Sequence, residues 1–181
     1  MIARVLAAAG LLLPLLLAAC SVSGTTRALA YYRKARTYHR DGNFDRAIAY
    51  YDTTLTLFAR PLATEIFTDR GEAYYGKGMM ARAIADFDSA LMIFPDAPRA
   101  RADRGASYLR LKQPNRAVID LTSALRLEPK LTWARYRRAH AWVAMDSLSR
   151  AIADLDTVLM AWKDREDIKV ERAQLRARVR H

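Results

Sequence analysis

The side chains that could do chemistry in this sequence are few and far apart. The single cysteine, Cys20, excludes an intramolecular disulfide and a cysteine-based zinc cluster, because each needs a second thiol. His39, His140 and His181 are isolated, so three distant segments would have to meet before they could bind a metal. The sequence contains no glycine-rich phosphate loop, no His-Glu-x-x-His pair and no serine-nucleophile elbow. It predicts no enzyme, no cofactor and no metal site.

Charge is the second chemical signal. Thirty Lys and Arg against 19 Asp and Glu give a formal net charge of +11 at pH 7. Four arginines, here called the arginine ladder, recur at nearly regular spacing and could follow an anionic polymer: they are Arg46, Arg82, Arg116 and Arg150. An aspartate follows each of the last three by four residues, which places each pair on one helical face and favours a structural role. These aspartates are Asp86, Asp120 and Asp154.

The elements that position these side chains must be held together by packing, because hydrophobic residues make up 52% of the chain and no disulfide is available. Seven Gly and six Pro are too few for a low-complexity chain, and the charged fraction of 27% is ordinary for a folded domain. A length of 181 residues allows one domain with an appended segment.

The first twenty residues form a separate segment. Arg4 is followed by an apolar run over 5–17 and then by Leu17-Ala18-Ala19-Cys20, which resembles the lipoprotein box of bacteria. The resemblance implies that residues 1–19 are a signal peptide and that Cys20 is acylated and anchors the chain in a lipid bilayer. Ser21 in second place then implies the outer membrane. An uncleaved membrane-spanning helix is the alternative, and Pro14 and the polar residues that follow Cys20 argue against it. Residues 20–26 become a lipidated tether.

Internal repeats organise the rest of the chain. The segments 83–91, 117–125 and 151–159 recur every 34 residues, each with Ala first, Asp fourth and Leu ninth. The segments 69–74 and 103–108 repeat with the same period. The segment 47–55 is an earlier copy of 83–91 and lies 36 residues before it, which places a two-residue insertion near Pro61. Small residues let two helix backbones approach, and bulky ones fill the space beside them. In the first helix the small residues are Ala35, Gly71, Gly105 and Ala139, followed by Tyr38, Tyr74, Tyr108 and Trp142; in the second they are Ala47, Ala83, Ala117 and Ala151, followed by Tyr51, Phe87, Leu121 and Leu155.

This pattern resembles the tetratricopeptide repeat (TPR). The resemblance implies an all-α fold, a right-handed superhelix of four helix-turn-helix units over 27–163, at about 28–61, 64–97, 98–131 and 132–163. The segment 164–181 is predicted to be a capping helix, acidic in its first turn and basic in its last. The family pattern has a leucine just before the small residue of the first helix, and a basic residue replaces it in every unit. The basic residues of the last three units could pair with the second-helix aspartates. The basic residues of all four units are Lys34, Arg70, Arg104 and Arg138.

The family's concave groove is lined by first helices, and the resemblance assigns it here residue by residue. Where some members clamp a terminal carboxylate with Lys and Asn, this chain has Tyr32, Asp69 and Asp103, so that binding mode is disfavoured. Trp133 and Tyr136 are predicted as the centre of a partner site, with the alternative that Trp133 packs under Leu127; Trp142 is predicted to be core. The predicted groove residues are Tyr32, Arg36, Asp69, Glu72, Tyr75, Arg99, Asp103, Arg110, Trp133, Tyr136, Arg137 and His140.

The function expected from the sequence is that of a membrane-anchored scaffold or assembly factor, which holds another protein or peptide in the groove within the bacterial cell envelope, at the outer membrane facing the periplasm. A rival expectation from another class is a basic protein that binds an anionic polymer, either nucleic acid or cell-wall material, through the arginine ladder. The aspartate spacing disfavours nucleic acid as the partner.

Overall fold

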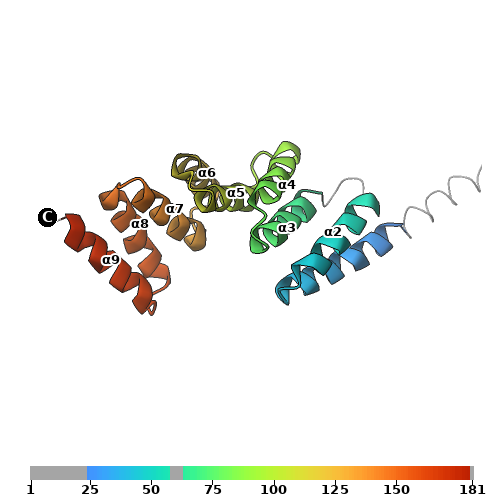
Figure 1. Cartoon of the computed structure of the whole chain (residues 1–181), viewed down its shortest axis with the longest axis horizontal. Coiled ribbons are helices and arrows are strands. Elements are labelled where there is room, and N and C mark those ends of the chain that lie inside the picture. The colour runs from blue at the N-terminus through green and yellow to red at the C-terminus, as the bar shows by residue number, and fades with distance from the viewer. Residues whose placement is uncertain (1–23, 58–62, 180–181) are drawn as a thin grey trace, which may run out of the picture.

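A computed structural model of the chain describes residues 24–57 and 63–179. Within these ranges the chain forms helices joined by short turns and contains no strand. Figure 1 shows the helices following one another in pairs along an arch, with α4 and α6 on its outer side. The helices cover residues 24–40, α2 (Phe44–Leu57), α3 (Ala63–Gly76), α4 (Met80–Ile93), α5 (Pro98–Arg110), α6 (Pro114–Leu127), α7 (Thr132–Ala144), α8 (Leu148–Ala161) and α9 (Glu166–Val179). The predicted all-α superhelix is confirmed.

The turn inside each helix pair has the same geometry. Its left-handed residue is Gly42, Gly78, Lys112 or Asp146, with φ between 54° and 79°. The next backbone N–H bonds the carbonyl of the first helix's aromatic residue at 2.9 Å in all four turns, as from Gln113 to Tyr108. This bond closes the end of the first helix and reverses the chain.

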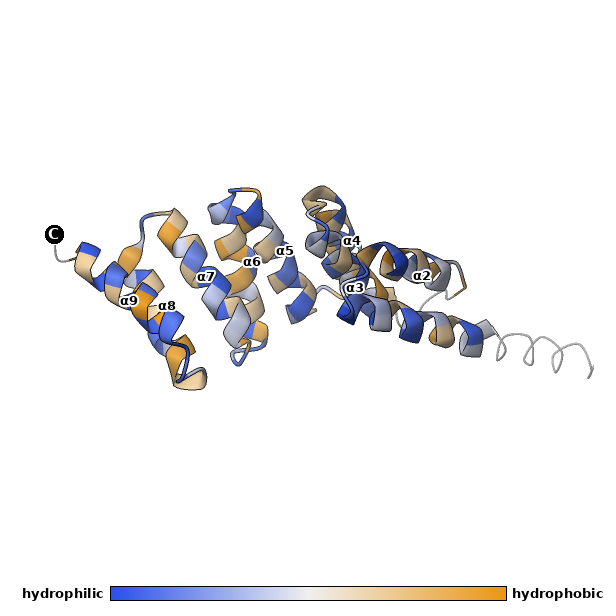
Figure 2. Cartoon of the chain, turned by 60° about the horizontal axis from the view of Figure 1, so that its bottom comes forward, coloured by the Kyte–Doolittle hydropathy of each residue, from blue (hydrophilic) through white to orange (hydrophobic). Residues whose placement is uncertain are grey.

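Each pair packs through its small residues. A Cβ added to Gly105 would stand 2.9 Å from Leu121 Cγ, and one added to Gly71 would stand 2.6 Å from the Phe87 ring. Only glycine therefore allows these two backbones to approach so closely. In Figure 2 each helix carries both hydrophobic and hydrophilic residues along its length, and those that pack between the helices of a pair are buried, such as Ala83 and Phe87. The predicted helix contact at Gly105 is confirmed.

The second-helix aspartates pair with arginines of the first helix. Arg104 holds Asp120 through Nε at 2.7 Å and Nη2 at 2.8 Å, and its Nη1 reaches Asp88 of the preceding unit at 2.7 Å. Arg70 and Arg138 hold Asp86 and Asp154 in the same bidentate way. The predicted pairing of Arg70, Arg104 and Arg138 with these aspartates is confirmed, and each arginine links its own unit to the one before it.

The arginine ladder makes a different contact from the one expected. The guanidinium groups of Arg46, Arg82, Arg116 and Arg150 lie over the first-helix rings Tyr38, Tyr74, Tyr108 and Trp142, at 4.8–5.7 Å from the ring centroids. The predicted pairing with an aspartate four residues later is wrong. Helical side chains point toward the N-terminus, so the ladder arginines extend away from those aspartates and toward the turn where the rings lie.

The N-terminal segment and the tether lie only partly within the described residues. Cys20 and Pro61 lie outside the described residues, so the signal peptide, the acylation and the insertion stay predictions. Residues 24–26, predicted as part of the tether, are helical. Among the described helices none is long and apolar enough to cross a membrane.

Candidate binding groove

One buried carboxylate collects side chains from three successive first helices. Asp69 of α3 is only 4% exposed and accepts a 2.8 Å hydrogen bond from the Tyr32 hydroxyl. Arg99 Nη1 of α5 lies 3.0 Å from Asp69 Oδ1, and Arg36 Nε lies 3.8 Å from Oδ2. Burial and the neighbouring Asp69 charge raise the pKa of Tyr32, so its hydroxyl keeps its proton and stays a donor. This network fixes the spacing of the first three units.

Arg99 extends the network along the groove. Its Nε donates to Glu72 Oε1 at 2.7 Å while Nη1 holds Asp69, so a single guanidinium bridges two carboxylates of α3. The Arg99 side chain is still 53% exposed, because the groove face of α5 is open to solvent. The planar guanidinium group presents several N–H donors in fixed directions, which lets it contact both carboxylates at once.

Glu72 faces a second carboxyl group, that of Asp103 on α5. Burial, and then the negative charge of Glu72, raise the pKa of Asp103 well above its ordinary value. Asp103 Oδ2 is buried and has no hydrogen-bond partner among the described residues. The two groups therefore form an acid pair that retains a proton at pH values where a free aspartate has lost it.

Two hollows open on this face. The first hollow, of about 210 Å³, is lined by Arg36, His39, Arg40, Tyr51, Asp69 and Arg99. Three arginines surround one carboxylate there, so its charge is positive and suits an acidic group. The His39 ring also meets the Tyr51 hydroxyl, with Nδ1 at 3.3 Å from the oxygen. Tyr51 and Arg40 were not predicted from the sequence as groove residues.

The second hollow, of about 130 Å³, is lined by Glu72, Tyr75, Phe87, Asp103, Ala106, Trp133 and Arg137. It therefore combines the acid pair with aromatic side chains of the second and fourth units. Arg110 lies beside it, with its guanidinium 5.5 Å from the centroid of the Tyr75 ring. Phe87 and Ala106 are buried residues that a pattern of exposed polar positions does not reveal. The predicted groove residues Glu72, Tyr75 and Asp103 thus lie together around the second hollow.

The predicted C-terminal end of the groove is covered by α9. The Tyr136 hydroxyl donates to Glu171 of α9 at 3.2 Å, and His140 Nε2 lies 3.5 Å from the same carboxylate. The Tyr136 ring also packs edge-on against His140 and Trp162. Tyr136 and His140 therefore attach α9 and do not line either hollow, because Glu171 occupies the space in front of them. The repeat pattern does not predict this role for Glu171.

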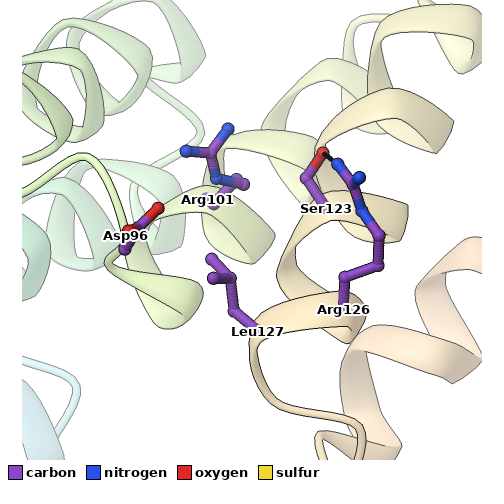
Figure 3. A pocket seen from close by; sticks show the side chains of 5 residues that line it. All are labelled: Asp96, Arg101, Ser123, Arg126 and Leu127. Carbon is purple, nitrogen blue, oxygen red and sulfur yellow. Dashed lines mark hydrogen bonds between the residues drawn. The ribbon is translucent and has the colours of Figure 1, made fainter.

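Trp133 combines parts of both alternatives considered for it. It is half-buried and packs against the core of α5 and α6, yet it also lines the second hollow. Leu127 is 44% exposed and lines a different hollow, shown in Figure 3, with Asp96, Arg101, Ser123 and Arg126. The predicted core residue Trp142 packs against the core of the last unit and remains partly exposed under Arg150.

Metal binding has no support in the part of the chain that the structure describes, where no group of three or more His, Cys, Asp or Glu residues could hold an ion. The chemistry of the groove is therefore that of charged and aromatic side chains: ion pairs, hydrogen bonds and ring contacts.

Comparisons with known proteins establish the class of the fold. A tetratricopeptide repeat model matches residues 32–98. A thermophilic TPR protein of Thermus thermophilus is 24% identical with a TM-score of 0.67, over 82% of this chain and 80% of that one. The first TPR of Spaghetti (RPAP3), bound to the HSP90 peptide SRMEEVD, is 23% identical with a TM-score of 0.64, over 67% and 97%. The second TPR domain of human RPAP3, in complex with the HSP70 peptide SGPTIEEVD, is 23% identical with a TM-score of 0.59, over 64% and 96%.

No curated protein matches the sequence. The family model and the structural neighbours agree with the helix pairs described above, so the protein has the fold of tetratricopeptide repeat proteins.

Proposed function

We propose that this protein is a scaffold that holds a segment of another protein in the groove formed by its first helices. The observation that carries the proposal is the convergence of side chains from four units on two adjoining hollows, one basic and one that joins an acid pair to aromatic walls. Aromatic and arginine side chains supply most of the binding energy of protein interfaces.

The basic first hollow suits an acidic segment of the partner. The structural neighbours from RPAP3 carry peptides that end in Glu-Glu-Val-Asp, so the fold accommodates acidic peptides. In this chain Arg36, Arg40 and Arg99 would contact the acidic side chains, while Asp69 orients Arg99. Tyr32, Asp69 and Asp103 stand at the places of the family's Lys and Asn clamp residues, so the proposed ligand is an internal acidic segment rather than a chaperone's C-terminal tail.

Membrane attachment through Cys20 is the second part of the proposal. An acylated Cys20 would keep the groove within a few residues of a bilayer, in the bacterial envelope and facing the periplasm if the membrane is the outer one. Two or more acyl chains are needed for stable anchoring, since one short chain binds only marginally. We expect acyl label on the N-terminal peptide of the mature wild-type protein and none after Cys20→Ala. A wild-type protein without that label would refute the anchor.

Crosslinking and charge reversal together test the groove. A photoreactive residue at Arg40 should capture the partner in intact cells, whereas the same residue at Ile119, exposed on α6, should not. With the captured partner purified, Arg36→Glu with Arg40→Glu should weaken binding at least tenfold, because two charge-assisted contacts are replaced by repulsion.

A matched double variant controls for net charge. Lys130→Glu with Lys163→Glu changes the charge equally at two exposed turn positions and should leave binding intact. Equal loss of binding in both double variants would contradict the groove and leave only a general effect of charge.

The arginine ladder supports a second candidate, binding of an anionic polymer. Its four guanidinium groups belong to exposed residues and lie over rings at equivalent places in successive units. Steep weakening of heparin binding with salt, abolished when all four arginines are replaced by alanine, would favour this candidate. Weak binding that the four replacements leave unchanged would remove it.

A further inference from the structure

Helix α9 occupies the place of the first helix of another repeat. It begins at Glu166, 34 residues after α7 begins at Thr132, and the same interval separates Arg172 and Ala173 from Arg138 and Ala139. In the second, third and fourth units, the first helix holds the second helix through an arginine and the small residue after it. Helix α9 carries the same two residue types at the same places. In the described residues α9 has no second helix of its own.

Arg172 bonds one of the two groups that its counterparts bond. In the second unit, Arg70 Nη1 reaches Asp52 of the preceding unit while Nε holds Asp86 of its own second helix at 2.8 Å. Arg172 Nη1 reaches Asp156 of the preceding helix in the same way, at 2.8 Å. Its Nε is buried without a hydrogen-bond partner among the described residues. Among the residues that the structure describes, no carboxylate takes the place that Asp86 has beside Arg70 Nε.

Ala173 is the second sign of an unfilled contact. Its four counterparts Ala35, Gly71, Gly105 and Ala139 are buried beneath the second helix of their units, whereas Ala173 is exposed. The Arg172 side chain is also 28% exposed, against 18%, 22% and 18% for its three counterparts. A small residue beside an arginine offers a close backbone approach and a charge-assisted bond to one docking helix.

We propose that the outer face of α9 is a docking site for an amphipathic helix of a partner protein, with an acidic residue for Arg172 and an alanine three residues earlier against Ala173. The chain itself defines this pattern three times, in Ala83 and Asp86, Ala117 and Asp120, and Ala151 and Asp154. An acidic residue of the occupant would meet the charge of Arg172, because Arg176 and Arg178 already pair with Asp156 and Asp146. This site is separate from the groove.

A synthetic peptide with the sequence of α8 (148–161) is the probe, because α8 is the helix that covers the matching face of α7. We expect the labelled peptide to bind the full chain in a fluorescence anisotropy titration. The peptide with Asp154→Asn should bind at least tenfold more weakly, since Arg172 loses a bidentate charged partner. Equal affinity of the two peptides would overturn the proposed contact.

Two variants of the protein locate the site. Ala173→Leu should abolish peptide binding and leave the Tm unchanged, because the residue is exposed in the free chain. Ala139→Leu, at the equivalent buried position, should lower the Tm. Peptide binding that survives Ala173→Leu would refute the site.

A fusion avoids the cost of folding a short peptide. A copy of residues 145–161 placed directly after Arg178 should raise the Tm, and Asp154→Asn within the copy should cancel most of the rise. A rise that depends on this aspartate supports the proposal, and the absence of both a rise and peptide binding overturns it. Self-association of the wild-type chain that Ala173→Leu abolishes would make a second copy the occupant and overturn the partner helix.

Discussion

At the scale of single residues, the groove depends on carboxyl groups that are held in three different ways. Asp69 accepts a hydrogen bond from Tyr32 and an ion pair from Arg99, Glu72 is bonded by the same arginine, and Asp103 lies against Glu72 with its Oδ2 buried and without a hydrogen-bond partner among the described residues. A cationic group of a partner that entered the second hollow would favour the ionised form of Asp103.

Asp103 should make the stability of the protein depend on pH. Its folded-state pKa is raised, so above about pH 4, where an unfolded aspartate is ionised, the folded protein binds more protons and its stability falls as pH rises. Asp103→Asn removes the free-energy cost of ionising this carboxyl group in the folded protein, and its amide keeps a donor for Glu72. We expect its gain in Tm over wild type to grow between pH 4 and pH 7. Asp96→Asn, in an exposed turn, is the control, and a gain that does not change with pH would contradict the raised pKa.

Gly105 sets the closest helix approach in the third unit. Gly105→Leu should lower the free energy of unfolding by on the order of 1–3 kcal/mol, because a Cβ there already meets Leu121 Cγ at 2.9 Å. Thermal or urea unfolding of the purified protein measures this loss. Ala85→Leu, at an exposed position of α4, is the matched control. Equal stability of the two variants would remove the proposed contact.

Among the helix pairs, the turns share one geometry but differ in the backbone strain at their left-handed residue. The left-handed position is glycine in the first two units, whereas Lys112 and Asp146 hold it in the last two with φ of 57° and 54°. A side chain at such a φ is strained, and aspartate tolerates it better than lysine does. The third turn is therefore the most strained of the four.

Replacement of Lys112 by glycine should relieve that strain. We expect Lys112→Gly to raise the free energy of unfolding by about 0.5–1 kcal/mol, the strain relieved less the backbone entropy that glycine loses. Asp146→Gly should give a smaller gain in the same urea titration. A destabilised Lys112→Gly variant would show that the lysine side chain makes a contact that outweighs the strain.

At the scale of the whole molecule, stability passes from neighbour to neighbour. Each described helix from α2 to α9 contacts only the next helix or the first helix of the adjoining unit. The arginines Arg70, Arg104 and Arg138 cross these boundaries by bonding the second helix of the preceding unit. A repeat protein of this kind opens unit by unit rather than all at once.

Damage to the last unit should therefore stay local. Trp142→Ala removes a ring that packs on the core of α7 and α8 and lies beneath Arg150. We expect faster amide hydrogen exchange in α7, α8 and α9, with protection in α3 and α4 nearly unchanged. Uniform loss of protection along the chain would mean that the units unfold as a single cooperative body.

The 34-residue spacing predicts the repeats and the helix pairs, because a helix contact repeated at that interval needs the same small and bulky residues each time. The sequence by itself also identified Arg70, Arg104 and Arg138 as partners of the second-helix aspartates, since charges buried between helices need opposite charges. The contacts of the arginine ladder and of α9 became visible only in the folded chain. Side-chain direction placed the arginine ladder over aromatic rings, and the packing of α9 put Glu171 against Tyr136 and His140. Long-range contacts of this kind depend on distances between units, which a local pattern does not contain.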